Sequence, residues 1–255
     1  MSSSFWSGEF YFNGIYSDTY NVCIVDFDSN EKIKQIGSNI NLDISEENSL
    51  NGRKTYIENN IKAENITIQL CRTDGNAWTE GDIISIYNWL FQKDFKRFQT
   101  VDYTSGYNLC YYLKAVRFSK FLNPYFRGYL EIEFMSYDAY CYSIPVNNFT
   151  LSSGSGTLNN YSNVYNTYKP KLKIIEGGDL TITNNTNGTS VQLSGIGGET
   201  IVVDCAMGTV VNSNGDNRFY LLTDYNLLEL ERGNNNISVS GLGRVEFICE
   251  FPIII

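Results

Sequence analysis

The stretch GEFYFNGIYSDTYNVCIVDF, residues 8–27, raises the question that decides the fold. It is rich in aromatic and β-branched residues, which suit pleated and half-buried surfaces. It therefore predicts two strands at the very start of the chain. A strand whose edge is unpaired is a template for pairing with another chain. The question is therefore whether these strands pair within the chain or with a neighbouring molecule.

Composition favours a large protein that is mainly β. The chain has 255 residues and a formal charge of -9, and a chain of this length can bury a sizeable core without disulfides. The acidic excess argues against stable nucleic-acid binding, which needs phosphate neutralisation. No signal peptide and no apolar run of about 20 residues is present, so we expect no membrane partner and folding in a reducing cytoplasm.

The residues that usually carry chemistry are missing or poorly spaced. The sequence has no histidine, which removes Ser-His-Asp, Cys-His and His-metal arrangements. The stretch from Asp26 to Gly37 begins like a calcium loop but lacks its glycine and its final glutamate. The six cysteines are widely separated and form no C-x-x-C pair, so we expect most to be reduced core residues. We predict no enzyme, no cofactor and no metal.

Residues 1–145 are predicted to form one domain with strands and a single helix. The polar span from Asp43 to Asn65 contains the turn pair Asn51-Gly52 and indicates a long hairpin or loop. The segment ITIQLC after it alternates as a strand with one buried face. In GYLEIEFMS, the alternation predicts that Glu131 and Glu133 lie on a solvated strand face and are not paired catalytic carboxylates.

The predicted helix lies in TEGDIISIYNWLFQKDFKRF, residues 79–98. Thr79 with Asp82 three residues later resembles a capping box. Lys96 and Arg97 would suit the last turn. The residues at helical spacing predict one apolar stripe that lies on a sheet: Ile83, Ile84, Tyr87, Leu90, Phe91, Phe95 and Phe98.

Residues 146–255 are predicted to form a second, all-β domain. About nine short apolar runs alternate with turn pairs such as Asn187-Gly188 and Asn214-Gly215. Short strands at this spacing indicate a sandwich or jelly roll. The exposed tyrosines of such a domain could stack on sugar rings, so a free-standing carbohydrate-binding adhesin is the alternative function.

The order of these features resembles the distal tail protein (Dit) family of long-tailed bacteriophages. The resemblance lies in FYFNG and YNVCIV, in EGDIISIYNWLF, and in YYLKAVRF followed by GYLEIEFMSYDAYCYS. The C-terminal half resembles that family in PKLKIIEGGDLTITNNTNG, GETIVVDC and LLELERGNNNISVSG. The resemblance implies a mainly β fold: a tail-tube-like sandwich or barrel with a flanking helix, followed by a galectin-like β-sandwich.

The same resemblance implies a structural, non-enzymatic role at the tail tip or baseplate of a virion, for a protein made in the host cytoplasm. The expected assembly is a homo-hexameric ring that joins the tail tube protein to the tip hub protein. Receptor-binding or other baseplate proteins could dock on its periphery, and DNA would pass through its lumen.

Two sets of residues follow from this expectation. In a closed ring every strand edge finds a partner, which makes the opening strands candidates for the oligomer interface, although pairing within the subunit remains the alternative. These candidates are Phe10, Tyr11, Phe12, Ile15, Val22 and Ile24. An acidic lumen would repel DNA, and the candidates for its lining are Asp43, Glu46, Glu47, Glu58 and Glu64.

Overall fold

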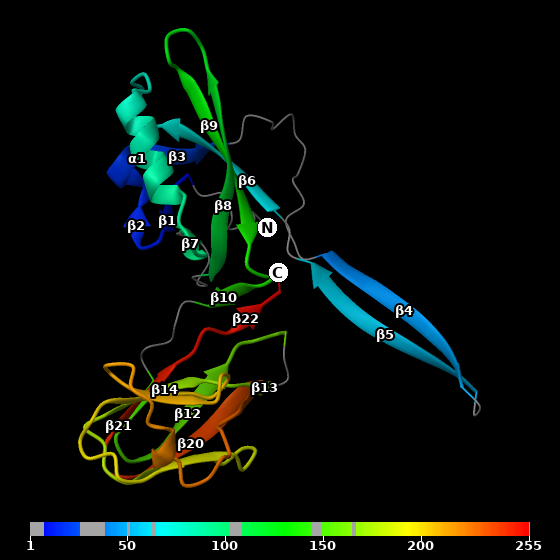
Figure 1. Ribbon diagram of the computed structural model, residues 1–255, viewed down its shortest axis with the longest axis vertical. Coiled ribbons are helices and arrows are strands. Elements are labelled where there is room, and N and C mark those ends of the chain that lie inside the picture. The colour runs from blue at the N-terminus through cyan, green and yellow to red at the C-terminus, as the bar shows by residue number, and fades with distance from the viewer. Residues whose placement is uncertain are drawn as a thin grey trace. The chain divides into compact units, whose positions relative to one another are not determined.

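The structure is a computed structural model that describes residues 8–25, 39–49, 52–62, 65–101, 109–143, 149–164 and 167–254 (Figure 1). The chain divides into two compact units. The first comprises residues 1–141 with Ile254–Ile255, and the second comprises Tyr142–Ile253. Both units are built almost entirely from antiparallel strands, as the composition predicts.

The elements of the first unit follow one another in a simple order, with one α-helix. They are β1 (Phe10–Phe12), β2 (Ile15–Tyr16), the 3-10 helix η1 (Ser17–Tyr20), β3 (Val22–Val25), β4 (Asn39–Ser49), β5 (Gly52–Lys62), β6 (Asn65–Arg72), α1 (Glu80–Leu90), β7 (Lys96–Thr100), β8 (Leu109–Leu122), β9 (Gly128–Ser136) and β10 (Cys141–Ser143), whose last residues lie in the second unit.

The main sheet of the first unit has the strand order β2-β1-β7-β8-β9-β6-β3. The path has two ends, so these described strands form an open sheet and not a closed barrel. The ends approach each other, because Ile24 donates its backbone N–H to the carbonyl of Gly8, just before β1, at 2.7 Å. The backbone just before β1 thus lies beside β3, the strand at one end of the path.

Trp89 is the centre of the aromatic core enclosed by this sheet. Its ring stacks on Phe10 at 5.4 Å and on Tyr20 at 4.6 Å between centroids. Its indole N–H donates to the carbonyl of Phe12 at 3.1 Å. This bond satisfies the polar edge of a residue that is 3% exposed, and it fixes α1 on β1.

Helix α1 confirms the predicted capping box but is shorter than the sequence pattern indicated. The Thr79 hydroxyl accepts the N–H of Asp82, and the Asp82 side chain accepts the N–H of Thr79. The helix ends at Leu90. The prediction that Lys96 and Arg97 close the helix is wrong, because both lie in β7, where pairing with β1 and β8 overrides helical spacing.

The buried face of α1 also differs from the predicted stripe. The buried residues are Ile83, Ile86, Trp89 and Leu90, whereas Ile84 is 59% exposed and Tyr87 is 46% exposed. Two apolar stripes with similar i, i+3 spacing run along this helix. Spacing alone does not distinguish them, and the stripe that carries Trp89 faces the sheet.

Strands β4 and β5 form a two-stranded ribbon of eleven residues per strand, with Ser49 opposite Gly52 (Figure 1). The polar span therefore contains a hairpin, one of the two forms predicted. Within the described part of the chain, β4 and β5 pair only with each other. We call this element the β4–β5 ribbon.

The second unit is a sandwich whose elements are β11 (Thr150–Leu151), β12 (Gly154–Asn160), β13 (Thr167–Tyr168), β14 (Lys171–Ile175), β15 (Leu180–Asn184), β16 (Ser190–Leu193), β17 (Ile201–Asp204), β18 (Thr209–Asn212), the 3-10 helix η2 (Phe219–Leu221), β19 (Leu230–Glu231), β20 (Gly233–Gly241) and β21 (Arg244–Ile248). The last strand, β22 (Pro252–Ile253), pairs with β10 and not with the sandwich sheets. One sheet has the order β11-β21-β14-β17-β18, the other has β12-β20-β15-β16, and β13 pairs with β19. Alternate residues of both sheets form a single apolar core.

A cluster of buried asparagines holds β19 against the end of this sandwich. Asn235 is fully buried, accepts the N–H of Glu231 at 2.8 Å and donates to the carbonyls of Glu231 and Gly233. It also accepts a hydrogen bond from Asn184, which donates to the carbonyl of Glu229 as well. Side-chain amides thus satisfy backbone groups that the strands leave unpaired.

Replacing Asn235 with alanine is predicted to destabilise the second unit by roughly 2–4 kcal/mol, because the N–H of Glu231 and the amide of Asn184 lose their buried partner. The neighbouring exposed Asn234→Ala should change stability by less than about 0.5 kcal/mol. Differential scanning calorimetry of both variants measures this difference. Equal melting temperatures for the two variants would contradict the role of the asparagine cluster.

Candidate assembly interface

The structure places most of the predicted interface side chains inside the subunit's own core. Phe10 and Phe12 are fully buried, and Val22 and Ile24 are at most 6% exposed. Tyr11 and Ile15 are the two that stay open to solvent, at 39% and 37% exposed. Any contact that the buried four make with a neighbour must therefore use their backbone.

Two strands end the main sheet and offer such backbone. β2 is joined to the sheet only through β1, with Phe12 opposite Ile15. β3 is paired on one side with β6, with Ile24 opposite Leu70. On its other side, Gly8 accepts the N–H of Ile24, so this edge is partly occupied by the chain's own N-terminal backbone.

The predicted lumen residues fall on the β4–β5 ribbon, with one exception. Asp43 lies directly opposite Glu58, and Glu47 lies opposite Lys54. Because residues two apart share a face of a strand, these positions share one face of the ribbon, and Glu46 falls on the other face. Glu64 lies outside the described residues.

The other face of the ribbon carries its apolar residues. Ile40, Leu42 and Ile44 alternate along β4, and the register sets Ile61 opposite Ile40 and Ile57 opposite Ile44. The ribbon is therefore amphipathic by position. A two-stranded hairpin alone is marginally stable in water at best, so a ribbon that pairs only with itself among the described strands is expected to need a partner.

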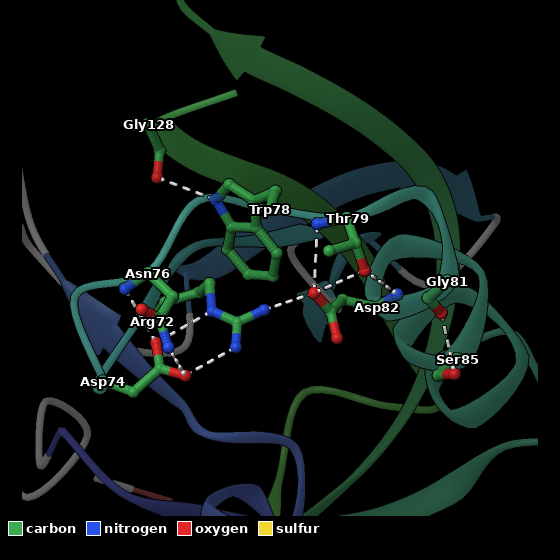
Figure 2. A network of polar contacts seen from close by, with 9 residues as sticks. All are labelled: Arg72, Asp74, Asn76, Trp78, Thr79, Gly81, Asp82, Ser85 and Gly128. Carbon is green, nitrogen blue, oxygen red and sulfur yellow. Dashed lines mark hydrogen bonds and ion pairs between the residues drawn. The ribbon is translucent and has the colours of Figure 1, made fainter. Parts of the chain in front are cut away.

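A polar network at the N-terminus of α1 links three elements of the first unit (Figure 2). Arg72, at the end of β6, donates through Nε to Asp74 at 2.9 Å and also bonds Asp82 in the first turn of α1. Its guanidinium lies 5.7 Å from the centre of the Trp78 ring. The hydrogen bonds of Thr79 hold the pKa of Asp82 below its ordinary value, and Arg72 adds to this effect.

Trp78 extends this network to the β8–β9 hairpin. Its indole N–H donates to the carbonyl of Gly128 at 3.0 Å (Figure 2). Its backbone N–H donates to the carbonyl of Phe126 at 2.8 Å. Gly128 has a φ of 145°, and a Cβ there would lie 2.0 Å from the carbonyl oxygen of Phe121. A glycine is therefore required where the hairpin closes onto Trp78.

The turn of this hairpin presents aromatic side chains to solvent. Tyr125 is 79% exposed and Phe126 is 51% exposed, and Phe126 adopts a left-handed φ of 56°. Such a conformation is unusual for a bulky residue and is often found at functional sites. Phe121 stacks on Tyr129 at 4.8 Å directly below the turn. We call Phe121, Tyr125, Phe126 and Tyr129 the aromatic tip.

A groove of about 400 Å³ lies on another part of the same unit. Its apolar surface comes from Trp89, Tyr20 and Ile15. Its polar surface comes from side chains of the β1–β2 turn and of one helix face: Asn13, Ser85, Asn88 and Gln92. The helical positions fall at i, i+3, i+4 and i+7, which places them on one stripe of α1 and just beyond its end. We call this surface the Trp89 groove.

Sequence reasoning missed both the aromatic tip and the Trp89 groove. A signal for the tip was present, since Asn123-Pro124 and Gly128 are turn residues that flank Tyr125 and Phe126. The groove had no local signal, because its residues come from two stretches, 13–20 and 85–92, that are far apart in the sequence.

Features of other protein classes were also sought in the described residues. Four of the six cysteines are buried, as predicted, Cys23 and Cys71 are partly exposed, and all six are outside disulfides. Within the described ranges, no group of three or more His, Cys, Asp or Glu residues could hold a metal ion. Among the helices described, none has the length and apolarity to cross a membrane.

Two family models match the chain in succession. Residues 5–136 match a phage tail protein N-terminal domain, and residues 140–249 match a phage tail C-terminal domain. The chain belongs to this family of phage tail proteins. A comparison with curated proteins finds no match.

Solved phage structures share the fold of this tail protein. The Dit protein (gp 19.1) of phage SPP1, described as a paradigm of the hub adsorption apparatus in phages that infect Gram-positive bacteria, aligns with a TM-score of 0.60 at 11% identity. That alignment covers 95% of this chain and 98% of the SPP1 chain. A chain of the phage p2 baseplate in its activated conformation with Sr aligns with a TM-score of 0.56 at 10% identity over 95% and 97% of the two chains. The tail protein therefore has a Dit-like fold.

The network around Asp82 leads to a test by pH. A carboxylate whose pKa is lowered by folding stabilises the protein above its ordinary pKa of about 3.9, and this contribution is lost as the pH falls below that value. Asp82→Asn should therefore cost about 1 kcal/mol at pH 7 and flatten the loss of stability in acid. All three tryptophans lie within residues 1–141, so urea denaturation followed by tryptophan fluorescence reports on the first unit.

The matched control is Glu80→Gln, which removes a carboxylate from the same first turn but from outside this network. It should cost a few tenths of a kcal/mol, the size of a helix-dipole contact, and should keep the acid dependence of the parent protein. A parental acid dependence in Asp82→Asn would show that Asp82 is not the group responsible.

Proposed function

We propose that this tail protein is a non-enzymatic connector at the distal end of a phage tail, or of a phage-tail-like particle. Six copies form a ring that joins the tail tube protein to the tip hub protein. Residues 1–145 form the ring, and residues 146–255 form a galectin-like sandwich that faces outward and docks receptor-binding or other baseplate proteins. The family match and the Dit-like fold support a structural role in the tail.

The observation that carries this proposal is that the β4–β5 ribbon pairs only with itself among the described strands. Its register sets Ile40 opposite Ile61 and Ile44 opposite Ile57. Each apolar side chain buried by a neighbour would contribute roughly 1.5–3 kcal/mol. Identical copies arranged head to tail can cover one another's ribbons, and a closed ring leaves none uncovered.

The open ends of the main sheet support the same arrangement. Side chains of the opening strands fill the subunit's own core, while the backbones of β2 and β3 lie at the two ends of the strand path. Gly8 of the same chain already occupies part of the β3 edge, so pairing between copies at that end would use the remainder of the edge. The interface assigned to Phe10–Ile24 is thus proposed to be made by backbone, with Tyr11 and Ile15 adding side-chain contacts.

The charge of the ribbon supports a lumen through which DNA passes without adhering. By register, Asp43, Glu47 and Glu58 fall on the side opposite Ile40 and Ile44 together with Lys54 and Lys62, so three acidic positions exceed two basic ones there. If the apolar face lies against a neighbour, this face is available to line the channel, and carboxylates there repel phosphates. Glu46 falls on the apolar face and is a weaker candidate, and Glu64 remains a candidate from the sequence alone.

The exposed tyrosines of the second unit favour the alternative function, a carbohydrate-binding adhesin. Tyr220 and Tyr225 are 76% and 78% exposed, and Tyr225 lies 5.7 Å from Phe219 between ring centres. Sugar rings stack on aromatic faces of this kind. This activity is compatible with a connector whose sandwich faces outward.

Electron microscopy of virions with a tag fused after Ile255 tests the connector. The expected image has the tag at the distal end of the tail, in a ring with sixfold order. A location elsewhere on the particle would contradict the proposal, as would an arrangement without sixfold order. Binding to a glycan array by a protein that stays monomeric at all concentrations would favour the adhesin.

A further inference from the structure

Two cysteines of the first unit lie directly opposite each other on neighbouring strands. The register of β3 with β6 sets Cys23 opposite Cys71. Both thiols are partly exposed, while Val22, Ile24 and Leu70 beside them in the two strands are buried in the core. The two thiols therefore share the sheet face that is turned away from the core. The other four cysteines are buried, so this pair is the one most open to a reagent.

A backbone hydrogen bond shows which kind of opposed pair the two cysteines form. Thr73 donates its N–H to the carbonyl of Asn21 at 2.9 Å. Cys23 follows Asn21 by two residues, and Cys71 precedes Thr73 by two. Alternate positions of an antiparallel ladder repeat the same pattern, so Cys23 and Cys71 occupy a hydrogen-bonded pair position. The Cα atoms of such a pair lie about 5.5 Å apart.

This spacing is suitable for a disulfide, whose Cα atoms usually lie about 4.4–6.8 Å apart. The Cβ atoms of directly opposed residues are roughly 4.5–5.5 Å apart, compared with about 3.5–4.5 Å in a disulfide. Closing the bond therefore needs a movement of about 1 Å. The strand β3 has four residues and lies at one end of the sheet path, where such a movement disturbs few neighbours.

Cys205 and Cys249 in the second unit provide the contrast. The residues just before them, Asp204 and Ile248, both pair with Lys171 of β14. A whole strand therefore lies between these two cysteines. Two strand spacings amount to about 9.5 Å, which is beyond the limit of about 7 Å for a disulfide. Direct opposition thus distinguishes the pair on β3 and β6.

We propose that Cys23 and Cys71 are a redox site that forms a reversible disulfide by exchange with a small-molecule disulfide of the glutathione class. The thiolate of one cysteine attacks the small disulfide, which gives a mixed disulfide and releases one small thiolate. The thiolate of the second cysteine attacks the protein sulfur of the mixed disulfide and releases the other. Two protein thiols are oxidised, one small disulfide is reduced, and the two protons pass to the released thiolates.

The surroundings of the two thiols keep the pair reduced until an oxidant persists. Burial raises the pKa of Cys23, and the charge of Glu9 raises it further. Burial also raises the pKa of Cys71, and the charge of the Cys23 thiolate adds to this effect. Little thiolate is therefore present at neutral pH. The thiol of Cys71 makes only a weak contact with the carbonyl of Gly128, at 3.6 Å, which the disulfide gives up at little cost.

The disulfide would close the segment that carries the β4–β5 ribbon into a covalent loop. The ribbon strands, Asn39–Ser49 and Gly52–Lys62, lie between Cys23 and Cys71 in the chain. A bond between the ends of a long loop restricts the unfolded chain more than the folded one. A reducing cytoplasm keeps thiols reduced, and an oxidising exterior allows disulfides to persist. The site would therefore stabilise the first unit once the protein is outside the cell.

Peptide mapping of the full-length protein tests the site. The folded protein is equilibrated in buffers of reduced and oxidised glutathione, and the remaining thiols are blocked with N-ethylmaleimide. Trypsin is then added without a reducing agent. Mass spectrometry should find residues 1–32 joined to residues 63–72, the tryptic peptides that contain Cys23 and Cys71. The four buried cysteines should carry no disulfide.

Two controls show whether the fold brings the thiols together. The same equilibration in concentrated urea should give an effective concentration for this linked peptide at least tenfold lower than in the folded protein, because the register no longer holds the pair. Cys71→Ser should give no linked peptide. Oxidation should raise the urea midpoint of tryptophan fluorescence in the parent protein and leave it unchanged in Cys71→Ser.

Several results would overturn the redox site. These are a mixed disulfide with glutathione that persists in the folded parent, linkage of other cysteines in its place, no reaction, an equal effective concentration in folded and unfolded protein, or an unchanged urea midpoint after oxidation. The inference goes beyond the proposed function and does not depend on it. A protein that forms no ring can still form this disulfide, and a ring can assemble from copies that do not.

Discussion

A two-stranded ribbon by itself is marginally stable in water, and this constraint underlies the account of how the first unit assembles. The β4–β5 ribbon places Ile40, Leu42 and Ile44 on one side, and the described strands of the chain supply no third strand to it. An element of this kind gains stability when something else pairs with it or covers it, and the proposed ring of identical copies would supply that partner.

The first unit divides its surface between its own stability and assembly. Phe10, Phe12 and Trp89 complete a core that needs no neighbour. The edges, the ribbon and the aromatic tip are left outside that core. Polar contacts around Arg72 and Trp78 then hold α1 and the β8–β9 hairpin in one arrangement (Figure 2). A subunit that is rigid in this way can present several separate contacts in fixed geometry, which lowers the entropy lost on assembly.

The sequence predicted the elements better than it predicted their surfaces. Alternation correctly set Leu130, Ile132 and Phe134 inside β9 and Glu131 outside, because a strand with one buried face has period two. The capping box of α1 was also readable, since it depends on residues three apart. The extent of the helix was not, because β7 is defined by pairing with β1, far away in the sequence. The buried stripe of α1 could not be chosen either, since Ile83 and Ile84 begin two stripes of equal spacing.

Interface residues were the hardest to predict, because their exposure also depends on contacts between segments that are distant in the sequence. Phe10 and Phe12 look adhesive in sequence, yet the sheet buries them completely within the subunit. Tyr125 and Phe126 look like an ordinary turn, yet Trp78, about fifty residues earlier in the sequence, fixes them in an exposed position. Whether an aromatic residue serves the core or a partner depends on contacts between distant segments, and local patterns do not encode these contacts.

Hydrogen exchange of assembled and dissociated protein, compared amide by amide, tests the central claim most directly. The account predicts that the amides of Asn39–Ser49 and Gly52–Lys62 exchange slowly in the assembled particle and at least tenfold faster in dissociated subunits. Amides of β8 and β9 should stay protected in both states. Equal protection of the β4–β5 ribbon in the two states would show that the ribbon needs no neighbour, and would contradict the account.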